Sequence, residues 1–177
     1  MLGRLRADNE QPGSYEFSEY LARVLNGKKL KGITRWKKNW AGRKGETADV
    51  AGLGPTDKAR VLVEVERLRE DPVSNVVKIW DWLQKGLVPQ DVIFIHAFSG
   101  AYGGRKKPRK ELAEFAGRRL GKEFRHATYK QISFAWKPKS GAKGIGGAAK
   151  RHADRLASSI IGLIKGFERA GRTLASI

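Results

Sequence analysis

The sequence predicts an α/β fold in which helices cover both faces of a mixed central β-sheet. Two observations support this prediction: segments with the two-residue alternation of strands are followed by segments at helical spacing, and only the first two predicted strands are joined by a short turn. A chain of 177 residues can bury one hydrophobic core. We therefore expect one domain over residues 14–177, preceded by a flexible tail at residues 1–13.

The N-terminal half of the domain is expected to contain a helix and a hairpin. Apolar side chains at helical spacing predict a helix over residues 14–26. The basic segment that follows has no clear period, so it could be an irregular arm or a short helix and strand. Its Trp36 and Trp40 could stack on bases or lie in the core. Residues 47–53 and 60–68 predict two strands joined by a Gly-Pro turn.

The second half predicts three helices and two strands. Asp71 is expected to cap a helix that has Pro72 at its first position and ends near Gly86. The apolar run at residues 91–98 predicts a buried central strand. A loop rich in Gly and basic residues then leads to the remaining elements, which are a helix over residues 110–120, a strand over residues 128–136 and a helix over residues 148–167.

The charge of the chain predicts a polyanionic partner. Lys and Arg number 36 against 18 Asp and Glu, which gives a formal charge of +18. Binding to DNA releases the counterions condensed on its phosphates, and RNA is not excluded as a partner. An anionic membrane surface is the competing explanation, but no apolar run is long enough to span a bilayer. The chain has no Cys, which excludes thiolate zinc sites and fits a cytoplasmic location.

The charges are segregated along the chain. Residues 23–44 contain basic side chains and no acid, and residues 105–130 are also mainly basic, whereas the segment between them is net acidic. The side chains expected to contact phosphates are Lys37, Lys38, Arg43, Lys44, Arg105, Lys106, Lys107, Arg109 and Lys143. A protein that holds phosphates with its flanks has little reason to gather carboxylates between them unless these hold cations.

Three of the carboxylates are predicted to share one face of the hairpin. Glu64 and Glu66 are separated by one residue of a strand, so they point the same way, and Asp49 lies on the preceding strand. Like charges brought together need a cation among them. Mg²⁺ or Mn²⁺, which prefer oxygen ligands, would satisfy this need and could promote attack on a phosphodiester.

These residues resemble the PD-(D/E)XK nuclease superfamily, which has the restriction-endonuclease-like fold. The resemblance covers residues 47–98, and there Asp49 and Glu64 match the two acids of the motif. Glu66 stands where the family usually has Lys, although some restriction endonucleases carry Glu at this place. The resemblance implies a Mg²⁺-dependent endonuclease acting on DNA in restriction, repair or junction resolution.

The expected site roles follow from this resemblance. Asp49 and Glu64 would bind the metal with the Val65 carbonyl, and Glu66 would hold or deprotonate the attacking water. Glu19 is a weaker candidate that more often would be a surface residue. His96 could contact phosphate, but a satisfied structural histidine is the more frequent case.

Two alternatives about the whole protein stay open in the sequence. A non-catalytic nucleic-acid-binding protein would carry the same acids as surface or salt-bridge residues. A homodimer is expected if both DNA strands are cut symmetrically.

Overall fold

The computed structural model describes residues 14–67, 71–136 and 145–170. The elements found in these ranges, in chain order, are α1 (Ser14–Asn26), β1 (Arg35–Arg43), β2 (Glu46–Leu53), β3 (Ala59–Glu66), α2 (Val73–Gln84), β4 (Ile93–Ser99), the short 3₁₀ turns η1 (Gly100–Tyr102) and η2 (Gly104–Lys106), α3 (Lys107–Glu123), β5 (Thr128–Phe134) and α4 (Gly147–Arg169). The predicted flexible tail at residues 1–13 lies outside the described residues.

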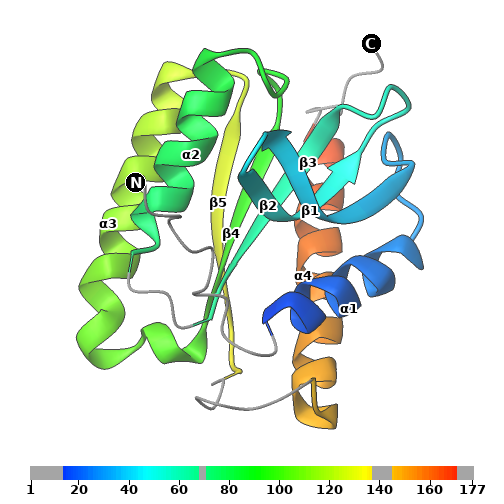
Figure 1. Ribbon diagram of the computed structural model, residues 1–177, viewed down its shortest axis with the longest axis vertical. Helices are drawn as coiled ribbons and strands as arrows, with labels where there is room; N and C mark the ends of the chain where they lie inside the picture. Colours follow the sequence, from blue (N-terminus) through cyan, green and yellow to red (C-terminus); the bar gives the residue numbers. More distant parts are fainter. Residues whose placement is uncertain (1–13, 68–70, 137–144, 171–177) are drawn as a thin grey trace, which may run out of the picture.

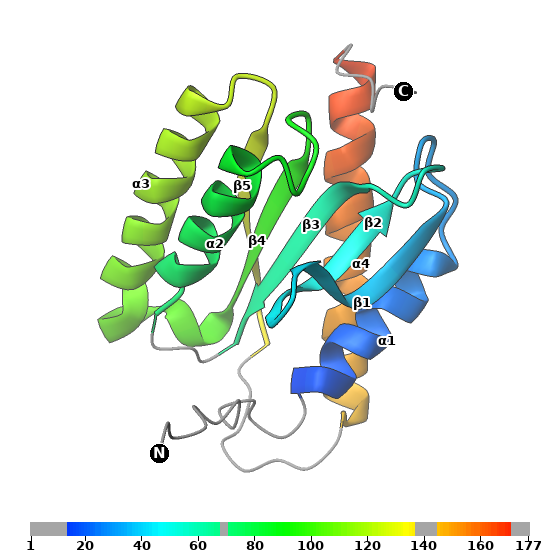
Figure 2. The same cartoon turned by 45° about the horizontal axis from the view of Figure 1, so that its top comes forward.

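The five strands form one mixed sheet in the order β1-β2-β3-β4-β5. The first three strands pair antiparallel, and β3, β4 and β5 pair parallel with α2 and α3 as the connections. Helices α2 and α3 cover one face of the sheet, and α1 and α4 cover the other (Figures 1 and 2). The predicted α/β class, with a mixed sheet and helices on both faces, is confirmed.

One hydrophobic core lies on each side of β3, because the side chains of this strand alternate between the two faces of the sheet. Val61, Val63 and Val65 belong to the core under α1 and α4. Leu62 belongs to the core under α2 and α3. The predicted alternation of this strand is therefore confirmed, and it directs Glu64 toward α2 and α3.

The strand register brings polar residues together on this second face. Val50 of β2 pairs with Val63 of β3, so Asp49 and Glu64 come next on the two strands. Across the parallel strands, Glu64 is in register with His96, and His96 with Gln131. The chain leaves β3, β4 and β5 at the same edge of the sheet, which is where α/β folds commonly bind ligands.

The basic segment with the two tryptophans forms a regular element, β1, which the sequence left open between an arm and a short helix and strand. Among the strands of the described ranges it pairs with β2 alone, and its register shifts between Ala41 and Arg43. Asn39 has a positive φ of 46°. These irregularities of an edge strand explain why no two-residue period is visible in the sequence.

Two predicted details of the helices are wrong. Helix α2 has Pro72 at its N-cap and no side-chain capping bond, because Asp71 lies one residue too early and accepts instead, through its carbonyl, a hydrogen bond from Ser74 Oγ at 2.8 Å. Helix α3 begins at Lys107, before the predicted residue 110, because Pro108 occupies the first turn, where no N–H is needed.

Within residues 14–67, 71–136 and 145–170, no helix combines the length and the apolar character required to cross a bilayer.

Candidate active site

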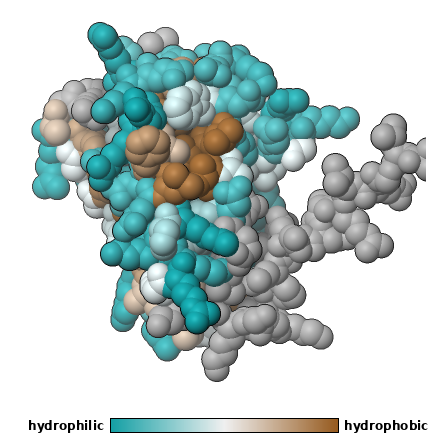
Figure 3. All heavy atoms as spheres, turned by 90° about the vertical axis from the view of Figure 1, so that its left-hand side faces the viewer, coloured by the Kyte–Doolittle hydropathy of each residue, from teal (hydrophilic) through white to brown (hydrophobic). Residues whose placement is uncertain are grey.

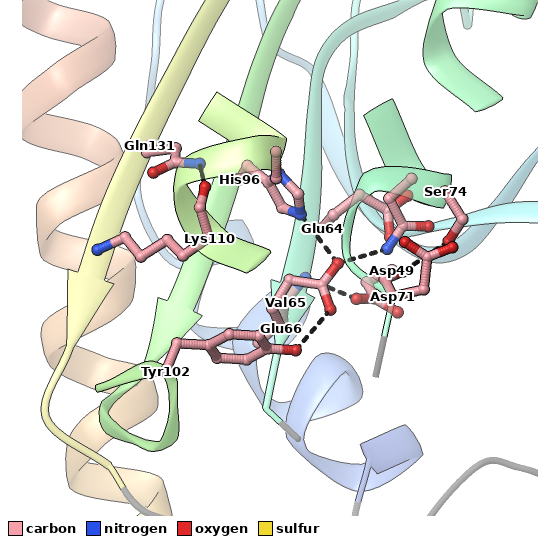
Figure 4. Close-up of polar contacts among 12 residues, drawn as sticks. Asp49, Glu64, Val65, Glu66, Asp71, Ser74, His96, Tyr102, Lys110 and Gln131 are labelled. Carbon is pink, nitrogen blue, oxygen red and sulfur yellow. Dashed lines mark hydrogen bonds and ion pairs between the residues drawn. The ribbon is translucent and has the colours of Figure 1, made fainter. Parts of the chain in front are cut away.

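The predicted metal ligands lie where β2 and β3 run side by side. Glu64 is only 2% exposed, although it is a carboxylate. Asp49 Oδ2 accepts a hydrogen bond of 2.7 Å from the backbone N–H of Val65, which fixes the Asp49 side chain against β3 (Figure 4). The structure thus brings Asp49, Glu64 and Val65 into one place, as the sequence predicts.

A lysine from α2, which the sequence analysis did not single out, enters this place. Lys78 Nζ lies 2.7 Å from Glu64 Oε1, 2.6 Å from the Thr47 carbonyl oxygen and 2.9 Å from Asn75 Oδ1. An ammonium group has three N–H donors, and each of them has an acceptor here. The Lys78 ammonium is therefore held in one position beside Glu64.

The electrostatics of the two acids are unfavourable despite this ion pair. Burial raises the pKa of Glu64 to about 8, because loss of hydration, together with the charges of Asp49 and Glu66, outweighs the attraction of Lys78. Burial also raises the pKa of Asp49, and the hydrogen bond from Val65 and the charge of Lys78 offset only part of this rise. The pair would gain stability from a further cation, which favours the ionised forms.

Glu66 lies in a buried hydrogen-bond network. Its Oε1 accepts from Asn75 Nδ2 at 2.7 Å and lies 2.8 Å from His96 Nε2, and its Oε2 accepts from the Tyr102 hydroxyl at 3.4 Å (Figure 4). Glu66 and His96 are 1% and 0% exposed. These bonds compensate for the cost of burying the Glu66 carboxylate.

Both ring nitrogens of the buried His96 have a polar neighbour. Burial lowers the pKa of His96, which favours the neutral imidazole, and Nε2 lies 2.8 Å from Glu66 Oε1. Nδ1 lies 3.2 Å from the Tyr129 hydroxyl, and this hydroxyl accepts from Gln131 Nε2 at 2.9 Å. This burial is what a structural histidine would show, and its contact with Glu66 links His96 to the site.

Asn75 joins the two halves of the site. Its Nδ2 donates to Glu66 Oε1, and its Oδ1 accepts from Lys78 Nζ. Glu66 therefore orients Asn75, Asn75 orients Lys78, and Lys78 contacts Glu64. An i,i+3 spacing places Asn75 and Lys78 on the same side of α2, facing the sheet.

Basic side chains gather beside the network, at the segment that connects β4 to α3. Lys106 Nζ lies 5.9 Å from the centre of the Tyr102 ring, and Tyr102 itself contacts Glu66. Lys110 Nζ donates to Ser133 Oγ at 2.7 Å and lies over the Phe98 ring. Arg105, Lys107 and Arg109, which the sequence predicts to contact phosphates, are exposed on the same segment.

The other predicted residues lie elsewhere. Glu19 pairs with Lys38 at 2.8 Å on the face covered by α1, and so does not reach the carboxylates. Trp36 is 5% exposed and belongs to the core, and Trp40 packs edge-on against Trp82. On β1 and its turn, Lys37, Arg43 and Lys44 are exposed. Lys143 lies outside the described residues.

The partners from α2 and η1 were missed because no motif marks them. Lys78 and Asn75 lie at the border of an amphipathic helix, where polar residues are ordinary. Tyr102 ends the short turn η1 and is followed by two glycines. The one available signal was their position directly after strands that carry Glu66 and His96.

A divalent metal fits this donor set only in a limited way. Among the described parts of the chain, no group of three His, Cys, Asp or Glu side chains is placed to hold a metal ion. Asp49 and Glu64 are nevertheless two hard oxygen donors, and Mg²⁺ commonly uses one or two carboxylates with waters and substrate phosphates. The chemistry of the two acids therefore suits Mg²⁺ or Mn²⁺, whereas Glu66 is engaged with protein donors.

Comparisons of the chain with protein-family models, with curated proteins and with solved structures find no match.

Proposed function

We propose that the protein is a metal-dependent nuclease that hydrolyses DNA phosphodiester bonds, on a sheet of the restriction-endonuclease-like type. The observation that carries this proposal is the adjacency of the half-buried Asp49 and the buried Glu64 on β2 and β3, and burial raises the pKa of both acids. The chain has a charge of +18, and carboxylates buried on its sheet do not contribute to solubility. Their burial therefore favours a functional role.

Asp49 and Glu64 would hold Mg²⁺ or Mn²⁺, with the Val65 carbonyl as a further oxygen donor. The ion would supply a Lewis acid for the phosphoryl group and would lower the pKa of water. Metal binding would also displace the proton that burial keeps on Glu64 near neutral pH.

Lys78 would provide the positive charge that the motif usually places at the position of Glu66. Its ammonium already lies 2.7 Å from Glu64 Oε1, so it could stabilise negative charge that develops on a phosphate bound beside that carboxylate. In this arrangement Glu66 is a positioning residue, because it acts on Lys78 through Asn75.

The basic side chains between β4 and α3 would hold the DNA backbone. Arg105, Lys106 and Arg109 follow shortly after η1, whose Tyr102 contacts Glu66. Their charge would place a phosphate near the carboxylates and make binding salt-dependent. A smooth decrease of DNA affinity with added salt is expected from this contact.

Plasmid cleavage with and without Mg²⁺ or Mn²⁺ tests the proposal, using Asp49→Asn and Glu64→Gln as the variants. Each should reduce cleavage by roughly 100-fold or more, while DNA binding survives because a negative charge near the phosphates is removed. Glu16→Gln is the matched control, since it removes one exposed carboxylate from α1 and should cleave like the wild type.

Calorimetric titration with Mn²⁺ separates the nuclease from a non-catalytic DNA-binding protein. The nuclease should bind the ion, and the heat should disappear in both site variants. If the wild type binds DNA but neither binds metal nor nicks plasmid, the Lys78–Glu64 pair is a structural ion pair and the non-catalytic function replaces this proposal.

A further inference from the structure

Helices α2 and α3 expose an apolar patch to solvent on the side that faces away from the sheet. Val77 of α2 is 56% exposed, and Leu112 and Phe115 of α3 are 56% and 59% exposed. Figure 3 shows this face, with apolar side chains gathered among hydrophilic ones. Large aromatic and aliphatic side chains grouped in this way commonly mark an interaction surface.

The patch is separate from the carboxylates. Helix α3 turns Ala113, Gly117 and Leu120 toward the core, and Leu112 and Phe115 lie on its opposite side. The site residues of α2, Asn75 and Lys78, contact Glu66 and Glu64 on the side of the sheet. A partner could therefore cover Phe115 without closing the site.

Charges are arranged in a regular order around Phe115. Every fourth residue of α3 gives a row in which bases and acids alternate about this aromatic ring, namely Lys107, Glu111, Phe115, Arg119 and Glu123, all of them exposed. Residues four apart form a ridge along a helix, and such ridges are the commonest packing surface between helices. The Arg119 guanidinium lies 5.6 Å from the centre of the Phe115 ring.

This row is complementary to itself when reversed. Consider an antiparallel pair of α3 helices centred on Phe115. A residue that precedes Phe115 by a given number of positions then lies opposite the residue of the other copy that follows Phe115 by the same number. Glu111 then faces Arg119 of the other copy, and Lys107 faces Glu123. Every base thus meets an acid, and the two Phe115 rings meet at the two-fold axis.

We propose that the protein forms a homodimer in which α3 packs antiparallel against α3 of a second copy, with Phe115 at its centre. The charge of the row identifies a second copy as the occupant. Its two bases and two acids cancel, whereas a surface for DNA would carry bases only. Val77 extends the apolar centre from α2, which packs beside α3 through the hydrogen bond of 3.1 Å between Trp80 Nε1 and Glu123 Oε1. The inference does not depend on the nuclease activity.

Sedimentation equilibrium of the full chain at about 0.15 M salt, over a range of protein concentrations, tests the dimer. Glu111→Arg places two arginines opposite each other, and Arg119→Glu places two glutamates opposite each other. Each should weaken the dimer at least about tenfold, because like charges in contact are repulsive. The double variant Glu111→Arg/Arg119→Glu restores opposite charges and should regain the dimer.

Mixing the two single variants gives the sharpest result. One carries only bases at these two positions and the other only acids, so the mixture should form a heterodimer although each alone is weakened. Glu16→Arg makes the same charge change on α1 and should leave the dimer intact. Circular dichroism of each variant establishes that loss of the dimer is not loss of the fold.

Three outcomes would overturn the proposal. The first is a wild type that is monomeric at every concentration. The second is a double variant or a mixture that stays as weak as the single variants. The third concerns a chain that is monomeric. If Arg119→Glu then decreases DNA affinity by a larger factor than Glu111→Arg increases it, this face would be assigned to nucleic acid.

Discussion

The two faces of β3 differ in what they bury. On the face under α1 and α4, the strand contributes Val61, Val63 and Val65 to a purely apolar cluster. On the face under α2 and α3, the corresponding positions are Leu62, Glu64 and Glu66, and both carboxylates are almost fully buried. The same strand is thus a plain core element on one side and a polar centre on the other.

This difference separates stability from chemistry. Burying valine stabilises the fold, whereas burying a carboxylate costs free energy that only hydrogen bonds and cations offset. Glu66 is compensated by Asn75, His96 and Tyr102. Glu64 is compensated only in part by Lys78, because its pKa is still raised to about 8. Substitutions on the apolar face should therefore reduce stability and leave activity unchanged, whereas substitutions on the polar face should reduce activity.

After the two carboxylate variants, the largest effect is expected from Lys78→Met, which keeps the length of the side chain and removes its charge. Cleavage should fall by roughly 100-fold, the typical loss when one preorganised donor is removed from an active site. Plasmid nicking under single-turnover conditions measures the change, and Lys78→Arg should recover part of the rate. Lys85→Met is the matched control, because Lys85 is the C-cap residue of the same helix and pairs with Asp81. Equal cleavage by the wild type and Lys78→Met would remove Lys78 from the mechanism.

Val63→Ala examines the apolar face of the same strand. Val63 is fully buried between β3 and the helices α1 and α4, so deleting its two methyl groups should lower the free energy of unfolding by about 2 kcal/mol. Urea denaturation measures this loss. The rate of cleavage per folded molecule should be unchanged, and a large loss of that rate would show that the two faces are not independent.

The free energy of unfolding, measured as a function of pH, tests the polar face independently of catalysis. The folded pKa of Glu64, about 8, lies above the ordinary value of 4.5 that applies to the unfolded chain. Between these values the folded state keeps a proton that the unfolded state has lost, so stability should fall as pH rises from about 4.5 to about 8. One proton gives at most about 1.4 kcal/mol per pH unit.

Comparison with a variant isolates the contribution of Glu64. Thermal unfolding of the wild type and of Glu64→Gln should give curves that converge at low pH and separate toward pH 8, with the variant the more stable of the two. Mg²⁺ should stabilise the wild type more at pH 8 than at pH 6, because it binds the ionised carboxylate. Parallel curves in the absence of metal would contradict the raised pKa.

The sequence was sufficient to predict elements that are buried on one side, because such burial produces a regular hydrophobic period. The alternation in β3, the amphipathic helices and the apolar run of β4 each predicted the right element. It was insufficient for β1, because an edge strand with a bulge and a positive φ at Asn39 has no regular period.

The site was predictable only in part, for a geometric reason. Asp49 and Glu64 could be paired because a short hairpin fixes the register of its two strands. The approach of His96 to Glu66 depends on how β4 is placed beside β3 after a helical crossover, and no local pattern specifies this placement. The approach of Lys78 to Glu64 depends in the same way on the rotation of α2 about its axis.

The smallest effect is expected at Glu19, the acid that the sequence suggested as a further candidate. Glu19 Oε2 lies 2.8 Å from Lys38 Nζ, but its side chain is 56% exposed, and ion pairs of this kind contribute between 0 and about 1 kcal/mol. Glu19→Gln should therefore change the free energy of unfolding by less than about 0.5 kcal/mol and leave both cleavage and Mn²⁺ binding as in the wild type. Calorimetry and plasmid nicking on the same preparation measure the latter two. A loss of metal binding in Glu19→Gln would mean that α1 contributes to the site across the sheet, which would abolish the distinction between the two faces.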